Sequence, residues 1–148
     1  MISDILGLPT KNEVKIDGET WEFEILRPRD RGARASLVSQ ILGGASLESV
    51  SQEDHGTALM VATLKVICRS APTWFREKFW PEGSVYPQFE NFPDEEYMLE
   101  LYNAAMAKET AFAEAKKKLR SPKISPEPKM GGRSAPAKDV QGTADLPL

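Results

Sequence analysis

The chain has 148 residues, of which 41% are hydrophobic and 28% charged, values typical of one globular domain with a single core. Its net charge of −3 and pI near 5.3 argue against a nucleic-acid partner, because domains that bind nucleic acid often have a pI above about 9. A single cysteine and a single histidine exclude an intramolecular disulfide and a thiol-based metal cluster, so neither a metal nor a cofactor is expected.

The sequence also argues against a membrane partner. Asp4 stands where a signal peptide would carry positive charge, so no signal peptide is expected. The most apolar run, residues 58–68, is interrupted by Thr63 and Lys65 and is shorter than the roughly 20 residues that span a bilayer. A reducing compartment is expected.

Residues 13–26, EVKIDGETWEFEIL, predict a β-hairpin. Apolar and charged residues alternate before and after the pair Asp17-Gly18. Such a pair between alternating runs is a strong hairpin signal, because a type I′ turn needs positive φ at both central positions. The predicted hairpin has one apolar face and one strongly acidic face.

Two helices should follow the hairpin. Asp30 is placed to cap the first, which is predicted to run to Leu42 and to end at Gly43-Gly44. After a linker that could hold one helical turn, Ser51 begins a second predicted helix that reaches about Ser70. Apolar residues cover nearly every face of this second helix, which predicts a central place in the core.

An aromatic segment follows, with seven rings in 19 residues: Trp74, Phe75, Phe79, Trp80, Tyr86, Phe89 and Phe92. Residues 73–80 predict a short helix, and prolines should keep the rest irregular. The rings could simply cover the central helix, since each aromatic side chain buries roughly 150–250 Å². Alternatively, some could remain exposed as anchors of an interface, which makes the segment the best candidate for a partner-binding surface.

The last predicted helix begins at Pro93 and runs to about Leu119, with acidic residues at its start and basic residues at its end. Residues 121–148 hold five prolines, three glycines and no aromatic residue, which predicts a flexible arm. The expected fold is therefore mainly α (α+β). It has an N-terminal β-hairpin, a three- to four-helix body within a domain of residues 1–120, and an extended C-terminal tail.

Few residues suggest catalysis. His55 could be a base or ligand and Cys68 a nucleophile, but each is better explained by its position in the second helix. The acidic groups Glu22/Glu24 and 94–96 have structural explanations, as a solvent-facing strand and a helix start. No phosphate-binding, dinucleotide, zinc-protease or EF-hand motif is present. The chain is not expected to be an enzyme, unless a cleft brings the two acidic groups together.

Arg27, Arg29, Arg31 and Arg34 form a local basic cluster. Such arginines could pair with phosphates of nucleic acid. Because the cluster is short and the chain is acidic, an acidic protein partner is the preferred interpretation. Arg27, Arg29 and Arg31 therefore join the aromatic residues as candidate partner-binding residues.

The order of parts resembles small bacteriophage tail-assembly proteins. The matching parts are LPTKNEVKIDGETWEFEILRPRDR (residues 8–31), the helix that begins there, and EEYMLELYNAAMAKETAFAEAKKKL (residues 95–119). The resemblance is to tail assembly chaperones and related small baseplate hub proteins. It is one of layout over residues 8–119, and it carries no catalytic residues.

This resemblance implies a non-catalytic protein that binds tail tube, tape-measure or baseplate subunits, in the virion tail or the host cytoplasm. A chaperone would hold an aggregation-prone tail protein until the tube polymerises, whereas a hub protein would remain in the particle. The alternative is an intracellular regulatory adaptor or antitoxin-like binding module whose tail folds onto a single partner.

Overall fold

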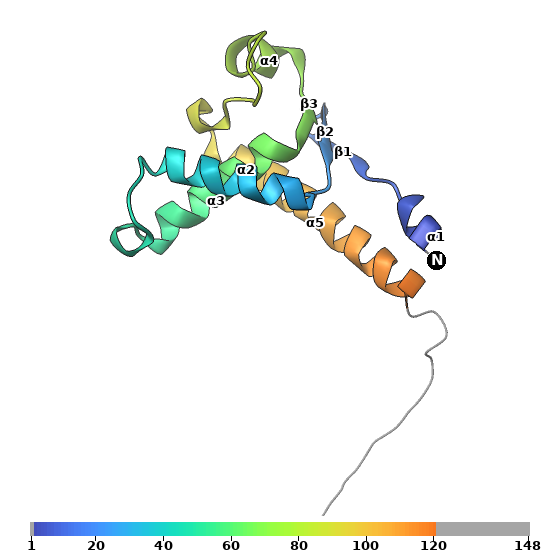
Figure 1. Ribbon diagram of the computed structural model, residues 1–148. Coiled ribbons are helices and arrows are strands. Elements are labelled where there is room, and N and C mark those ends of the chain that lie inside the picture. The colour runs from blue at the N-terminus through green and yellow to red at the C-terminus, as the bar shows by residue number, and fades with distance from the viewer. Residues whose placement is uncertain (1, 121–148) are drawn as a thin grey trace, which may run out of the picture. The chain divides into compact units, whose positions relative to one another are not determined.

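The computed structural model describes residues 2–120 and is about 62% helical, with a small antiparallel three-stranded sheet (Figure 1). The predicted fold class, mainly α with an N-terminal β-hairpin, is confirmed. The predicted arm, residues 121–148, lies outside the described residues. The described chain divides into two compact units, one formed by Pro9–Ala113 and the other by residues 2–8 and 114–120.

The smaller unit contains a short helix that the sequence did not predict, α1 (Ile2–Leu6). Its end is closed by the N–H of Gly7, which donates to the carbonyl of Ser3 at 3.1 Å. The same unit contains the last turns of α5 (Glu95–Arg120).

The larger unit begins with the hairpin of β1 (Lys11–Ile16) and β2 (Glu19–Glu24), which pair antiparallel. Asp17 and Gly18 have φ values of 52° and 80°, the positive pair that a type I′ turn requires. Val14 lies opposite Trp21, and both are buried on the inner face. The hairpin prediction is confirmed.

The outer face of the hairpin is not strongly acidic, so this part of the prediction is wrong. Lys11 lies opposite Glu24 on the paired strand and Lys15 lies opposite Thr20, so the only acidic pair in this register is Glu13 opposite Glu22. The two lysines of β1 place positive charge among the glutamates of β2, as oppositely charged cross-strand neighbours often do.

A third strand, β3 (Cys68–Ser70), pairs antiparallel with β2. The second predicted helix therefore ends early: α3 spans Gln52–Ile67 rather than reaching Ser70. β3 supplies hydrogen-bonding partners to backbone groups of β2 that would otherwise form a sheet edge. At the other end the prediction is confirmed, because the Ser51 hydroxyl accepts a hydrogen bond from the N–H of Asp54 at 3.0 Å.

The helix after the hairpin, α2 (Pro28–Ile41), starts earlier than predicted. Pro28 takes the first helical position, where its missing N–H costs no hydrogen bond. Asp30 is not the capping residue, since it lies inside the first turn and accepts a hydrogen bond from the N–H of Arg27 at 2.9 Å. Gly43 and Gly44, with φ values of 69° and 78°, end the helix as predicted.

Short elements connect the remaining helices. The linker after α2 holds η1 (Leu47–Ser49), and the aromatic segment holds α4 (Thr73–Phe79) and η2 (Phe89–Asn91). The last helix, α5, does not begin at Pro93. The Asp94 carboxylate accepts a hydrogen bond from the N–H of Tyr97 at 3.1 Å, which caps the helix before Glu95.

The core of the larger unit surrounds α3. Residues 60–68 are all buried, and Figure 1 shows α2 running alongside this helix. Hydrophobic residues that are almost fully enclosed come from β2, α3, α4, η2 and α5: Trp21, Phe23, Leu64, Ile67, Phe75, Phe89 and Leu101. The central place predicted for the second helix is confirmed.

Candidate functional site

An aromatic cluster gathers around Trp21 of β2. Its ring centroid lies 4.9 Å from that of Phe75 on α4 and 5.9 Å from that of Phe89 on η2. Its indole N–H donates a hydrogen bond to the hydroxyl of Tyr97 on α5, at 3.1 Å. The aromatic segment therefore packs against the hairpin, a contact between parts of the chain that are far apart in sequence.

Two of the seven predicted partner-binding rings belong to this core. Phe75 and Phe89 have 0% exposed surface, so neither can contact a partner of the folded protein. For these two residues the prediction of a partner-binding role is wrong. The physical reason is their contact with Trp21, which encloses both rings.

The other five rings keep some exposed surface. Trp74 is 38% exposed, and Phe79, Trp80, Tyr86 and Phe92 are half-buried. Trp74 lies with its ring centroid 6.1 Å from that of Phe92 and 6.3 Å from that of Tyr97, and these last two are 5.8 Å apart. We call Trp74, Phe92 and Tyr97 the Trp74 surface.

Tyr97 was not among the predicted residues. Its position four residues before buried Leu101 places it beside the apolar stripe of α5, a signal that could have identified it.

The arginine cluster separates into paired and unpaired side chains. Arg27 lies 3.8 Å from the Glu24 carboxylate, and Arg29 lies 3.9 Å from Asp30. Within residues 2–120, no carboxylate forms an ion pair with Arg31 or Arg34.

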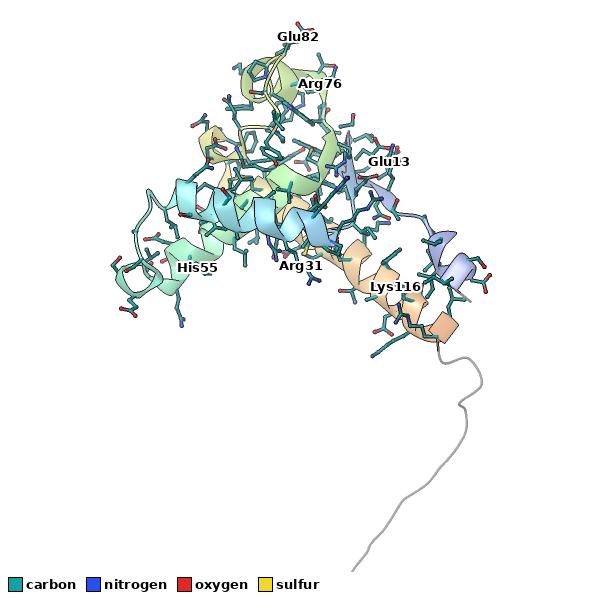
Figure 2. All side chains as sticks on the ribbon, viewed as in Figure 1. Glu13, Arg31, His55, Arg76, Glu82 and Lys116 are labelled. Carbon is teal, nitrogen blue, oxygen red and sulfur yellow. The ribbon has the colours of Figure 1, made fainter. Side chains whose placement is uncertain are left out.

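An open cavity of about 490 Å³ lies between α2 and α3, and we call it the α2–α3 groove. Arg34 contacts Thr63 in the second half of α3, whereas His55 lies in the first turn of that helix. Arginines and histidine therefore occupy opposite ends of the groove, and Figure 2 shows Arg31 and His55 on the same side of the two helices. Between them the groove is lined by small and apolar residues: Ala35, Val38, Ser39, Leu42, Ala45, Ser46 and Leu59.

Two of the carboxylates considered for catalysis have structural partners. The Glu24 carboxylate accepts a hydrogen bond from Nε of Arg69 at 2.9 Å, and Asp94 caps α5. Cys68 is buried, and burial raises the pKa of its thiol to about 12. In the part of the chain that the structure describes, no three histidine, cysteine or acidic side chains are grouped to hold a metal ion.

Cys68 should react very slowly with iodoacetamide at pH 8. The thiolate is the reactive form, and a pKa of about 12 leaves the thiol protonated at this pH. Mass spectrometry of the alkylated protein should show little modification of the native chain and complete modification in 6 M guanidinium, a concentration on the order of those that unfold stable domains. Rapid alkylation of the native protein would contradict the buried position.

None of the helices within residues 2–120 combines the length and the apolar character needed to cross a bilayer. Comparisons of the chain with protein-family models, curated proteins and solved structures find no match.

Proposed function

We propose that this protein acts by binding other proteins, without catalysing a reaction, as a small assembly component or assembly chaperone of a bacteriophage tail or baseplate. Its partners would be tail tube, tape-measure or baseplate subunits, met in the host cytoplasm or in the virion tail. The layout of residues 8–119 is the basis for the phage setting.

The Trp74 surface is the observation that carries the protein-binding part of the proposal. A tryptophan that is 38% exposed and touches two half-buried rings is pre-ordered by its neighbours. Tryptophan and tyrosine are enriched among residues that dominate binding energy, because they bury large areas at small conformational cost. Phe79, whose ring centroid lies 5.4 Å from that of Phe92, would contribute to the rim of the same interface.

The test is co-expression of the full chain with tail tube and tape-measure proteins, followed by co-purification and measurement of affinity. Trp74→Ala should weaken the complex about 10- to 100-fold, the range of an interface hot spot, and should lower the melting temperature by only a few degrees, roughly as expected for 1 kcal/mol. Trp74→Phe should give an intermediate affinity.

Val85→Ala is the matched control, because Val85 is 80% exposed and lies outside the Trp74 surface. This variant should bind like the wild type. Equal losses for Trp74→Ala and Val85→Ala, or no complex with any tail protein, would contradict the proposal.

A further inference from the structure

The α2–α3 groove has the dimensions of a site for a short helix. From Arg31 on α2 to Leu42 just after its end, it extends over about three helical turns, roughly 16 Å at the helical rise per residue. The short side chains of Ala35 and Ser39 leave apolar atoms of Leu42 and Leu59 within reach of a ligand. Its volume of about 490 Å³ is comparable to that of small-molecule pockets, about 300–1,000 Å³, which is room for side chains from one face of a helix.

The positive charges of Arg31 and Arg34 at one end of the groove are not paired with any carboxylate among the described residues. Arg34 donates from Nη1 to the hydroxyl of Thr63 at 3.3 Å, and this hydroxyl itself donates to the carbonyl of Leu59 at 2.7 Å. A neutral hydroxyl engages only one of the five N–H donors of a guanidinium group. Exposed Arg31 has no carboxylate partner among residues 2–120.

Two arginines outside the groove share one carboxylate of the larger unit. Glu24 binds both Arg27 and Arg69, at 3.8 Å and 2.9 Å. Arg31 and Arg34 differ from these arginines in their position, because they lie one helical turn apart beside the apolar residues that line the groove. A carboxylate that approached from outside could accept two hydrogen bonds from a guanidinium group.

We propose that the α2–α3 groove binds an amphipathic helix of a partner protein, with two acidic residues one turn apart over Arg31 and Arg34. The apolar face of that helix would contact Val38, Leu42 and Leu59, the helix-in-groove mode of recognition. This inference takes its setting from the proposed function but uses a surface separate from Trp74.

The test measures binding of fluorescein-labelled helical peptides to the full chain by anisotropy. The probe has about 16 residues, with leucines spaced three and four residues apart and two glutamates one turn apart near one end. Matched peptides carry glutamine or lysine in place of glutamate. The glutamate peptide should bind about tenfold more tightly than the glutamine peptide, and the lysine peptide should bind most weakly.

Variants of the full chain assign the binding site. Arg31→Gln breaks no ion pair among the described residues, so its loss of affinity would report only the bound carboxylate. Arg31→Gln/Arg34→Gln should remove the preference for glutamate, whereas Arg29→Gln, whose side chain is 71% exposed outside the groove, should keep it. Ala35→Trp should block all three peptides by filling the groove.

Three outcomes would overturn the inference. In the first, the glutamate peptide does not bind. In the second, the preference for glutamate survives the double substitution. In the third, the wild-type protein is a dimer in sedimentation and the double substitution dissociates it, which would assign the groove to a second copy of the chain. Trp74→Ala should leave peptide affinity unchanged. If the peptide does not bind but tail proteins still do, only the inference about the groove is refuted. If the peptide binds but no tail protein does, only the proposed function is refuted.

Discussion

Replacing Trp21 with alanine should lower the free energy of unfolding by about 3–5 kcal/mol, the cost of removing a large ring from a packed core. Trp21 has 0% exposed surface and contacts rings from α4, η2 and α5. The substitution would therefore loosen four elements at once. Since a domain of this kind is stable by about 5–15 kcal/mol, urea unfolding followed by circular dichroism should show a large shift of the midpoint.

Two further substitutions distinguish the contribution of the Trp21 ring from that of its hydrogen bond to Tyr97. Tyr97→Phe keeps the packing but removes the hydroxyl that accepts from the Trp21 indole, and should cost about 1 kcal/mol. Trp74→Ala, at the exposed edge of the same cluster, should cost less than Trp21→Ala. A Trp21→Ala variant as stable as Trp74→Ala would show that the cluster does not depend on its central ring.

The sequence predicted the elements that are specified by local patterns. Asp17-Gly18 between alternating runs specified the hairpin turn, and Ser51 specified the start of α3. In both cases the stabilising hydrogen bonds or dihedral angles involve residues within a few positions of one another. Such interactions leave a readable pattern in a single sequence.

The third strand could not be predicted in this way. Residues 68–70 directly follow the apolar run of α3, and no glycine or proline separates them from that helix. What makes them a strand is pairing with β2, where Cys68 lies opposite Phe23, a residue far earlier in the chain. Partner strands override a local helical preference, as tertiary context often does.

The candidate sites, too, could be predicted from the sequence only in part. Composition identified the aromatic segment and the arginine cluster as unusual, but it did not assign individual residues within them. Phe75 is enclosed and its neighbour Trp74 is exposed because of where Trp21 lies. The α2–α3 groove likewise depends on which residues of two helices face each other, a register that neither helix specifies alone.

Lys65 provides the second large expected effect, because a charged side chain lies in the most apolar helix of the chain. Its side chain is only 7% exposed, and Nζ forms an ion pair with the carboxylate of Glu90 on η2. Removing one partner of a buried ion pair costs about 3–5 kcal/mol, because the other charge remains buried without compensation. Glu90 is 38% exposed, so water reduces this cost, and Glu90→Gln should lower the free energy of unfolding by about 1–3 kcal/mol.

Lys65→Met should be much less harmful than Glu90→Gln, although it breaks the same ion pair. Methionine has a similar length and removes the buried charge, while the Glu90 carboxylate that remains can be hydrated. We expect a change within about 1 kcal/mol, and the double variant should resemble Lys65→Met because the charge responsible for the penalty is gone. Urea unfolding of the two single variants, the double variant and the wild type gives the four free energies of unfolding that this double-mutant cycle requires. If Lys65→Met proved more destabilising than Glu90→Gln, the ion pair would be a net source of stability rather than a compensated buried charge.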